Sequence, residues 1–220
     1  MKQQPGRVLC GVLALSLMMP ACAPLVVAAV AAGTALVVTD RRSTGTQVDD
    51  QTTQLRVANE LSTALKGQPV HINVNSFERK VLLTGEVPDE ATKARAGEIA
   101  TASQGVRAVV NELAIGPPSS VSERTSDVTL AGKVRAAFIN TREIAFNSIE
   151  IVTERQIIYL LGVVTEREGE IAALVAAKVS GVKQVVKVFD YATREEVEQR
   201  RALTGTAPAA PTAPAPAPAK

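Results

Sequence analysis

The sequence predicts an α+β fold of two tandem domains, each with the order helix–strand–strand–helix–strand and with two helices packed on a three-stranded mixed sheet. The main evidence is an internal repeat, because residues 81–113 and 157–190 carry nearly the same pattern. In each copy an apolar run containing one glycine precedes a charged, alanine-rich stretch, and a second glycine then precedes a valine-rich run. Gly85 corresponds to Gly162 and Gly105 to Gly181. The helices of each copy are the elements available to cover the apolar face of its sheet.

The first copy contains both periodicities that this fold requires. Leu55/Val57, Leu61 and Leu65 recur at helical spacing, and the segment 70–74 alternates apolar and polar residues as a strand does. The expected elements are a helix over 51–66, strands over 70–74 and 80–87 with a polar turn at 75–79, a helix between Pro88 and Gly105, and a strand over 106–113. Proline is tolerated at the start of a helix because its missing N–H would be unpaired there.

The second copy repeats this order. Leu130, Val134 and Phe138 mark its first helix, and strands are expected over 148–153, 156–163 and 182–189, with Glu154–Arg155 as the turn between the first two. Thr165 and Glu168 fit a capping box, in which the two side chains satisfy each other's exposed amides. The segment 116–120, Gly-Pro-Pro-Ser-Ser, separates the copies. The expected domains are 49–116 and 122–190, followed by a helix in 191–206 and a disordered Ala/Pro tail over 207–220.

The N-terminus has the pattern of a secretory signal. Basic residues precede an apolar run, which ends at Met19-Pro20-Ala21-Cys22, a sequence that resembles a bacterial lipobox. We expect a signal peptide over 1–21, lipid attachment at Cys22 and a lipidated linker over 22–48. Ala23 follows the cysteine where an aspartate would resemble an inner-membrane retention signal, which favours the outer membrane. The alternative is an uncleaved membrane helix, since apolar residues continue to Val38.

One stripe on the first helix of the second copy is suited to a membrane surface. Val128, Arg135, Ile139 and Arg142 fall on one side of that helix, away from its core face, and Lys133 lies nearby. Aliphatic groups enter the acyl boundary while basic groups meet phosphates. The alternative is that Val128 and Ile139 pack against the first domain. The equivalent stripe of the first copy, around Leu55, Ala58 and Ser62 with Glu60 nearby, offers little to a lipid.

Other classes of function find little support. His71 is the single histidine, lies in an expected strand without cysteine ligands nearby, and is expected to be a surface residue. A serine nucleophile would lack a histidine to act as its base, and no glycine-rich phosphate loop is present. We therefore expect no catalytic residues, no metal site and no cofactor. The low aromatic content and the signal peptide argue against a nucleic-acid partner. Gly85 and Gly162 are expected to permit close backbone packing or a positive φ.

Leu83-Thr-Gly85-Glu-Val and Leu-Gly162-Val-Val, within the repeated unit, resemble the BON domain, and the chain from Cys22 to about residue 190 resembles the dual-BON-domain outer-membrane lipoproteins. Residues 39–50, 133–135, 162–168 and 179–183 carry the resemblance. It implies a non-enzymatic protein on the periplasmic face of the outer membrane that binds anionic phospholipid through the first helix of its second domain and supports envelope integrity. The family can carry a tryptophan near the start of that helix, whereas Thr129 stands there in this chain.

The phospholipid-binding residues expected on this basis are Val128, Thr129, Lys133, Arg135, Ile139 and Arg142. The alternative function is a periplasmic adaptor for outer-membrane protein assembly or for regulators of cell-wall enzymes. Its contact would be the added C-terminal helix and the Ala/Pro tail.

Overall fold

The computed structural model describes residues 40–204, which belong to the compact unit Val38–Lys220. The signal peptide, Cys22 and the Ala/Pro tail lie outside the described residues. The first domain comprises α1 (Thr44–Ala64), β1 (His71–Phe77), β2 (Lys80–Val87), α2 (Glu90–Ala102), β3 (Ala108–Asn111) and β4 (Ala114–Ile115). The second comprises α3 (Val121–Ile139), the 3₁₀ turn η2 (Phe146–Ser148), β5 (Ile149–Glu154), β6 (Ile157–Val164), α4 (Glu166–Ala177) and β7 (Gln184–Tyr191). Helix α5 (Arg194–Leu203) follows, and the predicted order of elements is confirmed.

Both sheets are mixed, as predicted. In each domain the first two strands form an antiparallel hairpin, and the last strand pairs in parallel with the second: β3 with β2, and β7 with β6. The predicted strand 106–113 is interrupted in the structure. The side chain of Asn111 accepts a hydrogen bond from the Leu113 amide, Leu113 is buried in the core, and the chain then pairs with β2 again as β4.

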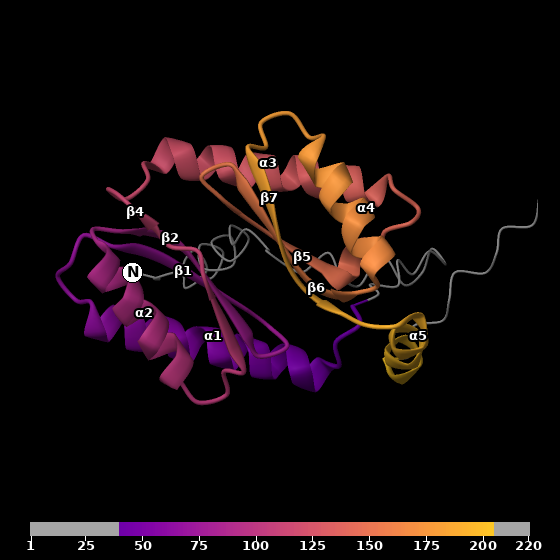
Figure 1. The fold of residues 1–220 in the computed structure, drawn as a ribbon, viewed down its shortest axis with the longest axis horizontal. Helices are drawn as coiled ribbons and strands as arrows, with labels where there is room; N and C mark the ends of the chain where they lie inside the picture. The colour runs from indigo at the N-terminus through magenta and orange to yellow at the C-terminus, as the bar shows by residue number, and fades with distance from the viewer. Residues whose placement is uncertain (1–39, 205–220) are drawn as a thin grey trace, which may run out of the picture. The chain divides into compact units, whose positions relative to one another are not determined.

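The helices of each domain cover one face of its own sheet. Val57 and Leu61 of α1 pack with Leu83 of β2 and Ala96 of α2. The second domain has an equivalent core, in which α3, α4 and the sheet contribute Val134, Ala172 and Leu160. Figure 1 shows α1 and α2 on one side of the first sheet, and α3 and α4 beside the second.

The faces of the two sheets that carry no helices pack against each other. Phe77 and Leu82 of the first sheet form a cluster with Tyr159 and Leu161 of β6 and Val188 of β7. Strands β2 and β6 are therefore covered on both faces, and each is buried along nearly its whole length. A strand buried on both faces is expected to show a continuous apolar run instead of alternation, and Val81–Leu83 and Ile157–Leu161 are such runs.

The first helix begins earlier than the predicted range of 51–66. Helix α1 begins at Thr44 with Ser43 as its N-cap, so the end of the expected linker 22–48 is helical. Before the helix, the guanidinium of Arg41 forms two hydrogen bonds with the Glu168 carboxylate, of 2.6 and 3.1 Å, and one of 2.8 Å with the Val163 carbonyl. Arg42 bonds to Asp50 of α1 and stacks over the Phe77 ring at 4.1 Å. These consecutive arginines attach the start of the described chain to both domains.

The hairpin turns also differ from the prediction. Strand β1 continues to Phe77, so its turn consists only of Glu78 and Arg79, and the second turn is Arg155–Gln156 instead of Glu154–Arg155. All four turn residues have positive φ, which non-glycine residues adopt uncommonly. The periodicity of the strands does not locate either turn, because the contact that stabilises each one comes from a helix far away in the sequence.

Gly85 and Gly162 confirm the expected close backbone packing. A Cβ on Gly85 would lie 2.0 Å from the His71 carbonyl oxygen, and one on Gly162 would lie 2.6 Å from that of Ser148. Gly85 also has a φ of +112°. Each glycine faces the neighbouring strand of its hairpin, where a side chain has no room.

Candidate functional site

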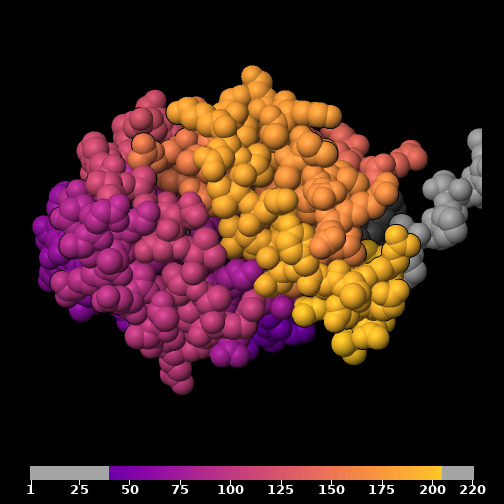
Figure 2. Space-filling model, in the orientation of Figure 1, coloured from indigo at the N-terminus to yellow at the C-terminus, as the bar shows by residue number. Residues whose placement is uncertain are grey.

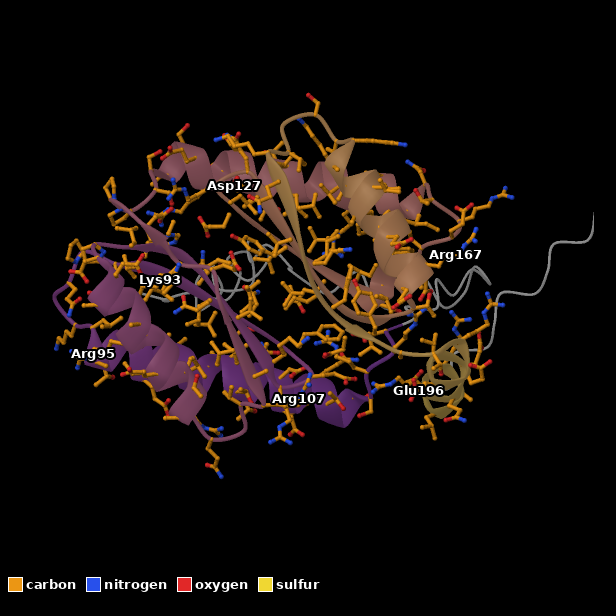
Figure 3. The ribbon with its side chains drawn as sticks, in the orientation of Figure 1. Lys93, Arg95, Arg107, Asp127, Arg167 and Glu196 are labelled. Carbon is orange, nitrogen blue, oxygen red and sulfur yellow. The ribbon has the colours of Figure 1, made fainter. Side chains whose placement is uncertain are left out.

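Helix α3 carries the predicted phospholipid-binding residues, and its ends and inner face are well fixed. Ser120 and Glu123 form a capping box at its N-terminus. The inner face buries Leu130, Val134 and Phe138 in the core of the second domain. Asp127, also on this face and labelled in Figure 3, accepts hydrogen bonds from both amides of the β5–β6 turn, of 2.8 and 2.9 Å. The helix is therefore held against the sheet along its length, and its other face is left to the solvent.

The outer face of α3 exposes aliphatic side chains. Val128 is 74% exposed and Ile139 is 55% exposed, so neither packs against the first domain. Val121 is 76% exposed and lies seven residues before Val128, on the same side of the helix. Val121 was not among the residues predicted from the sequence, although its spacing of seven residues from Val128 places it on the same stripe.

Basic side chains flank these aliphatic residues. Lys133 and Arg135 are exposed on α3, and Arg142 is exposed in the turn that follows it. None of the three forms an ion pair with another residue in the range 40–204. We define the outer face of α3 as Val121, Val128, Lys133, Arg135, Ile139 and Arg142. It combines exposed apolar groups with cations that remain available to an anion.

Thr129 contributes differently from the other predicted residues. It is exposed, but its hydroxyl donates a 3.0 Å hydrogen bond to the Thr125 carbonyl of its own helix. That donor is therefore already engaged, and the chain contains no tryptophan that could serve as a larger interfacial anchor.

Arg135 also lines a polar pocket of about 610 Å³ beside the outer face. Arg42, Phe77 and Glu150 contribute to the same pocket. Burial raises the pKa of the Glu150 carboxyl, and nearby Arg42 and the hydrogen bond from Asn75 only partly oppose this effect. The pocket therefore places an arginine of α3 close to the segment that enters the first domain.

Helix α1 is the natural comparison, because it occupies the same position in the first domain. It also exposes apolar side chains, Val48 and Leu55. However, Arg56, its only basic residue, donates to the Gln104 carbonyl. What distinguishes α3 from α1 is thus its free cations, and not exposed apolar area alone.

One group of polar residues was not predicted from the sequence. His71 is half-buried instead of exposed, and its Nδ1 lies 3.1 Å from the Glu86 carboxylate. The carboxylate of Glu154, from the second domain, completes the group. Burial raises the pKa of Glu154, and a hydrogen bond from Asn73 only partly opposes this effect. No local pattern connects these residues, because each lies on a different strand.

The fold and the surface of α3 together define a tandem-domain protein built from two similar α+β units. Each unit matches the family model for the BON domain, over residues 49–117 and 126–193. The chain therefore belongs to the BON-domain family.

Two curated relatives extend this likeness over most of the chain. An outer membrane lipoprotein, DolP, of Haemophilus influenzae is 36% identical over 170 residues, covering 75% of this chain and 88% of the relative. A 21 kDa hemolysin of Actinobacillus pleuropneumoniae is 32% identical over 153 residues, covering 69% of this chain and 79% of the relative. Among solved structures, the C-terminal domain of the type III secretion protein CdsD of Chlamydia trachomatis aligns with 10% identity and a TM-score of 0.27, over 64% of this chain and 99% of that domain.

None of the helices within residues 40–204 combines the length and the hydrophobicity that crossing a bilayer requires. The apolar stretch considered above as an uncleaved membrane helix lies outside these residues.

Proposed function

We propose that this protein is a non-enzymatic lipoprotein on the periplasmic face of the outer membrane, where the outer face of α3 binds anionic phospholipid and supports envelope integrity. Membership of the BON-domain family and the 36% identity to a relative named as an outer membrane lipoprotein support the location. The lipid attachment at Cys22 belongs to the same proposal.

The observation that carries the lipid proposal is the combination of exposed Val128 and Ile139 with Lys133, Arg135 and Arg142, none of which forms an ion pair within residues 40–204. A basic residue near an anionic membrane surface contributes about 1 kcal/mol. An aliphatic side chain that leaves water contributes roughly 1.5–3 kcal/mol when it is buried fully, and less at an interface. The sum corresponds to weak and reversible binding. A lipid anchor complements such a surface, because stable membrane attachment generally needs two signals.

A flotation experiment with residues 38–220 tests this proposal without the anchor. We expect this unit to float with vesicles that contain phosphatidylglycerol and to remain behind with vesicles of phosphatidylcholine alone. Recovery should fall as salt is raised, because the Debye length shortens to about 3 Å at 1 M salt. Equal recovery with the two kinds of vesicle would contradict the proposal.

Two variants of α3, each with a matched control elsewhere, test whether α3 is the surface that binds the vesicles. Arg135→Glu should weaken binding by roughly thirtyfold, since it removes one favourable charge and adds an unfavourable one, each worth about 1 kcal/mol. Arg95→Glu makes the same charge change at an exposed position of α2 and should bind as the parent protein does. Ile139→Ser should also weaken binding, and Leu174→Ser, at an exposed position of α4, is its control. A loss of the same size in each control would exclude α3 as the specific contact.

A further inference from the structure

The group formed by His71, Glu86 and Glu154 lies where the two sheets meet. His71 and Glu86 are opposite each other in the β1–β2 ladder, and Glu154 ends strand β5 of the second domain. One potential ligand atom of each residue lies within 4.8 Å of the others. The three residues therefore converge on one small volume, although two come from one domain and the third from the other.

The group is buried and rich in negative charge. Glu86 is 1% exposed and Glu154 is 5% exposed. Neither carboxylate forms an ion pair with a lysine or arginine of residues 40–204. Buried carboxylates usually have a cationic partner, coordinate a metal or take up a proton. His71 is the only potential cation that pairs with either carboxylate within the described part of the chain.

Hydrogen bonds from neighbouring amides orient the two carboxylates. The Asn73 amide donates to Glu154 at 2.6 Å, and the backbone amide of Ser119 donates to Glu86 at 3.0 Å. Contacts of this kind fix metal-binding carboxylates in other sites. They hold the side chains in place but supply no net positive charge.

A separate observation is that polar atoms beside the group lack partners. Thr84 is fully buried, and its Oγ1 has no hydrogen-bond partner in the described structure. It lies two residues from Glu86 on the same face of β2, opposite Asn73 in the ladder. The Oγ of Ser119 is likewise buried without a partner among residues 40–204. Buried hydroxyls are normally satisfied, so these two leave unused hydrogen-bonding capacity beside Glu86 that a further polar species could meet.

We propose that His71, Glu86 and Glu154 form a binding site for a divalent transition-metal ion, with Zn²⁺ as the best fit. One imidazole nitrogen and two carboxylate oxygens form a donor set that suits zinc, with a water molecule as the fourth ligand. The separation of His71 Nδ1 and Glu86 Oε2, 3.1 Å, is already close to the ligand spacing of a tetrahedral site, which is about 3.3 Å for bonds of about 2.0–2.1 Å. The Glu154 carboxylate, whose ligand atom lies within 4.8 Å of the other two, would complete the site by moving closer.

Such an ion would neutralise both buried carboxylates and join the two domains. Its ligands come from β1, β2 and β5, so binding would favour the arrangement in which the sheets are packed together. A species that binds only the folded state stabilises it in proportion to its affinity and concentration. The ion is therefore proposed as a structural connection between the domains, independent of the lipid-binding face of α3.

The sequence allows a direct test, because His71 is the only histidine. The full-length protein, purified without a polyhistidine tag, gives one imidazole in long-range ¹H–¹⁵N spectra. Adding Zn²⁺ alone should shift that resonance until one equivalent is bound, and Co²⁺ should produce the visible absorption of a four-coordinate site. An unchanged imidazole at tenfold excess of Zn²⁺ would overturn the proposal, as would an equal response to Mg²⁺.

Two substitutions that each remove one negative charge test where the zinc ion binds. Glu154→Gln preserves shape and should weaken Zn²⁺ binding at least tenfold, since weaker perturbations around metal sites already cost 10–100-fold. Glu170→Gln, at an exposed position of α4, should leave the dissociation constant unchanged. Equal affinity in the two variants would show that zinc binds elsewhere. The imidazole titration of the unaltered protein decides the question even if a variant fails to fold.

Discussion

Asp50 and Asp127 occupy equivalent positions in the two domains, and each binds the hairpin turn of its own sheet from the first helix. Asp50 accepts the amides of Glu78 and Arg79 at 2.9 and 2.8 Å, as Asp127 accepts those of Arg155 and Gln156. These carboxylates stabilise turns whose residues have positive φ without being glycine. A single buried acid per domain therefore fixes both the turn and the position of the first helix on the sheet.

Replacing Asp50 should destabilise the protein more than replacing its exposed neighbour, Asp49. Asp50 also binds the Ser76 hydroxyl and the Arg42 guanidinium, so Asp50→Ala leaves several buried donors unpaired. We expect a loss of about 2–3 kcal/mol in the free energy of unfolding. Asp49→Ala removes the same charge from an exposed position one residue away and should change the stability by less than about 0.5 kcal/mol. Urea unfolding measures both, and similar losses would disprove the role of the turn.

The two glycines of the hairpins should tolerate substitution poorly. Gly85→Ala places a methyl group against the His71 carbonyl and demands a positive φ from alanine, which we expect to cost about 3 kcal/mol. Gly132→Ala is the control, because this helical glycine has no neighbouring atom within 4 Å of its added Cβ and alanine favours a helix by about 1 kcal/mol. Thermal unfolding should therefore move in opposite directions for the two variants. Stabilisation by Gly85→Ala would contradict the close approach seen here.

The segment before α1 should detach when its ion pair is weakened. Arg41 is 3% exposed and binds Glu168 in two places. Glu168→Gln removes the charge but preserves the capping box of α4, because glutamine also fits that position. Leaving Arg41 buried without its anion should cost about 3 kcal/mol, because the Glu168 side chain is partly exposed. Hydrogen exchange of residues 40–50 should accelerate, whereas Glu170→Gln should have no effect on that segment. Unchanged exchange in Glu168→Gln would show that the pair does not hold the segment.

The contact between the domains should weaken in acid. Asp190 accepts hydrogen bonds of 2.7 Å from Lys80 and 2.6 Å from Arg107 of the first domain. Burial alone would raise its pKa, but these two cations outweigh that effect and hold the pKa below its usual value of 3.8. A carboxyl with a lowered pKa stabilises the folded state above its usual pKa and loses that contribution as the pH falls through the lowered value.

Asp190→Asn should therefore reduce stability by about 1 kcal/mol at pH 7, because the group is partly exposed and screened. The difference from the parent protein should begin to shrink as the pH falls below 3.8 and should disappear once the pH lies below the lowered pKa of Asp190. Unfolding by urea at a series of pH values measures this difference. A difference that persists unchanged in acid would mean that the charge of Asp190 is not what joins the domains.

Helix α5 could be recognised from the local sequence, but its position on the protein depends on tertiary contacts. Its position after residue 193 and its charged character could be recognised, and it forms part of the surface shown in yellow in Figure 2. Its attachment could not be foreseen, because it depends on burial of Val197 and on an ion pair between Arg200 and Glu78 of the first domain.

The sequence by itself determined the repeat, the order of the elements, the capping box at Thr165 and Glu168, and the assignment of Leu130, Val134 and Phe138 to the core. These follow from local rules: helical and strand periodicity, capping, and the need for glycine where backbones meet. The tertiary structure alone decided that the two sheets share a core around Leu82 and Leu161. A continuous apolar run predicts burial on both faces but does not specify the partner, because contacts between distant strands leave no periodic signal in either one. The meeting of His71, Glu86 and Glu154 has the same physical origin, since it exists only once the two sheets are packed face to face.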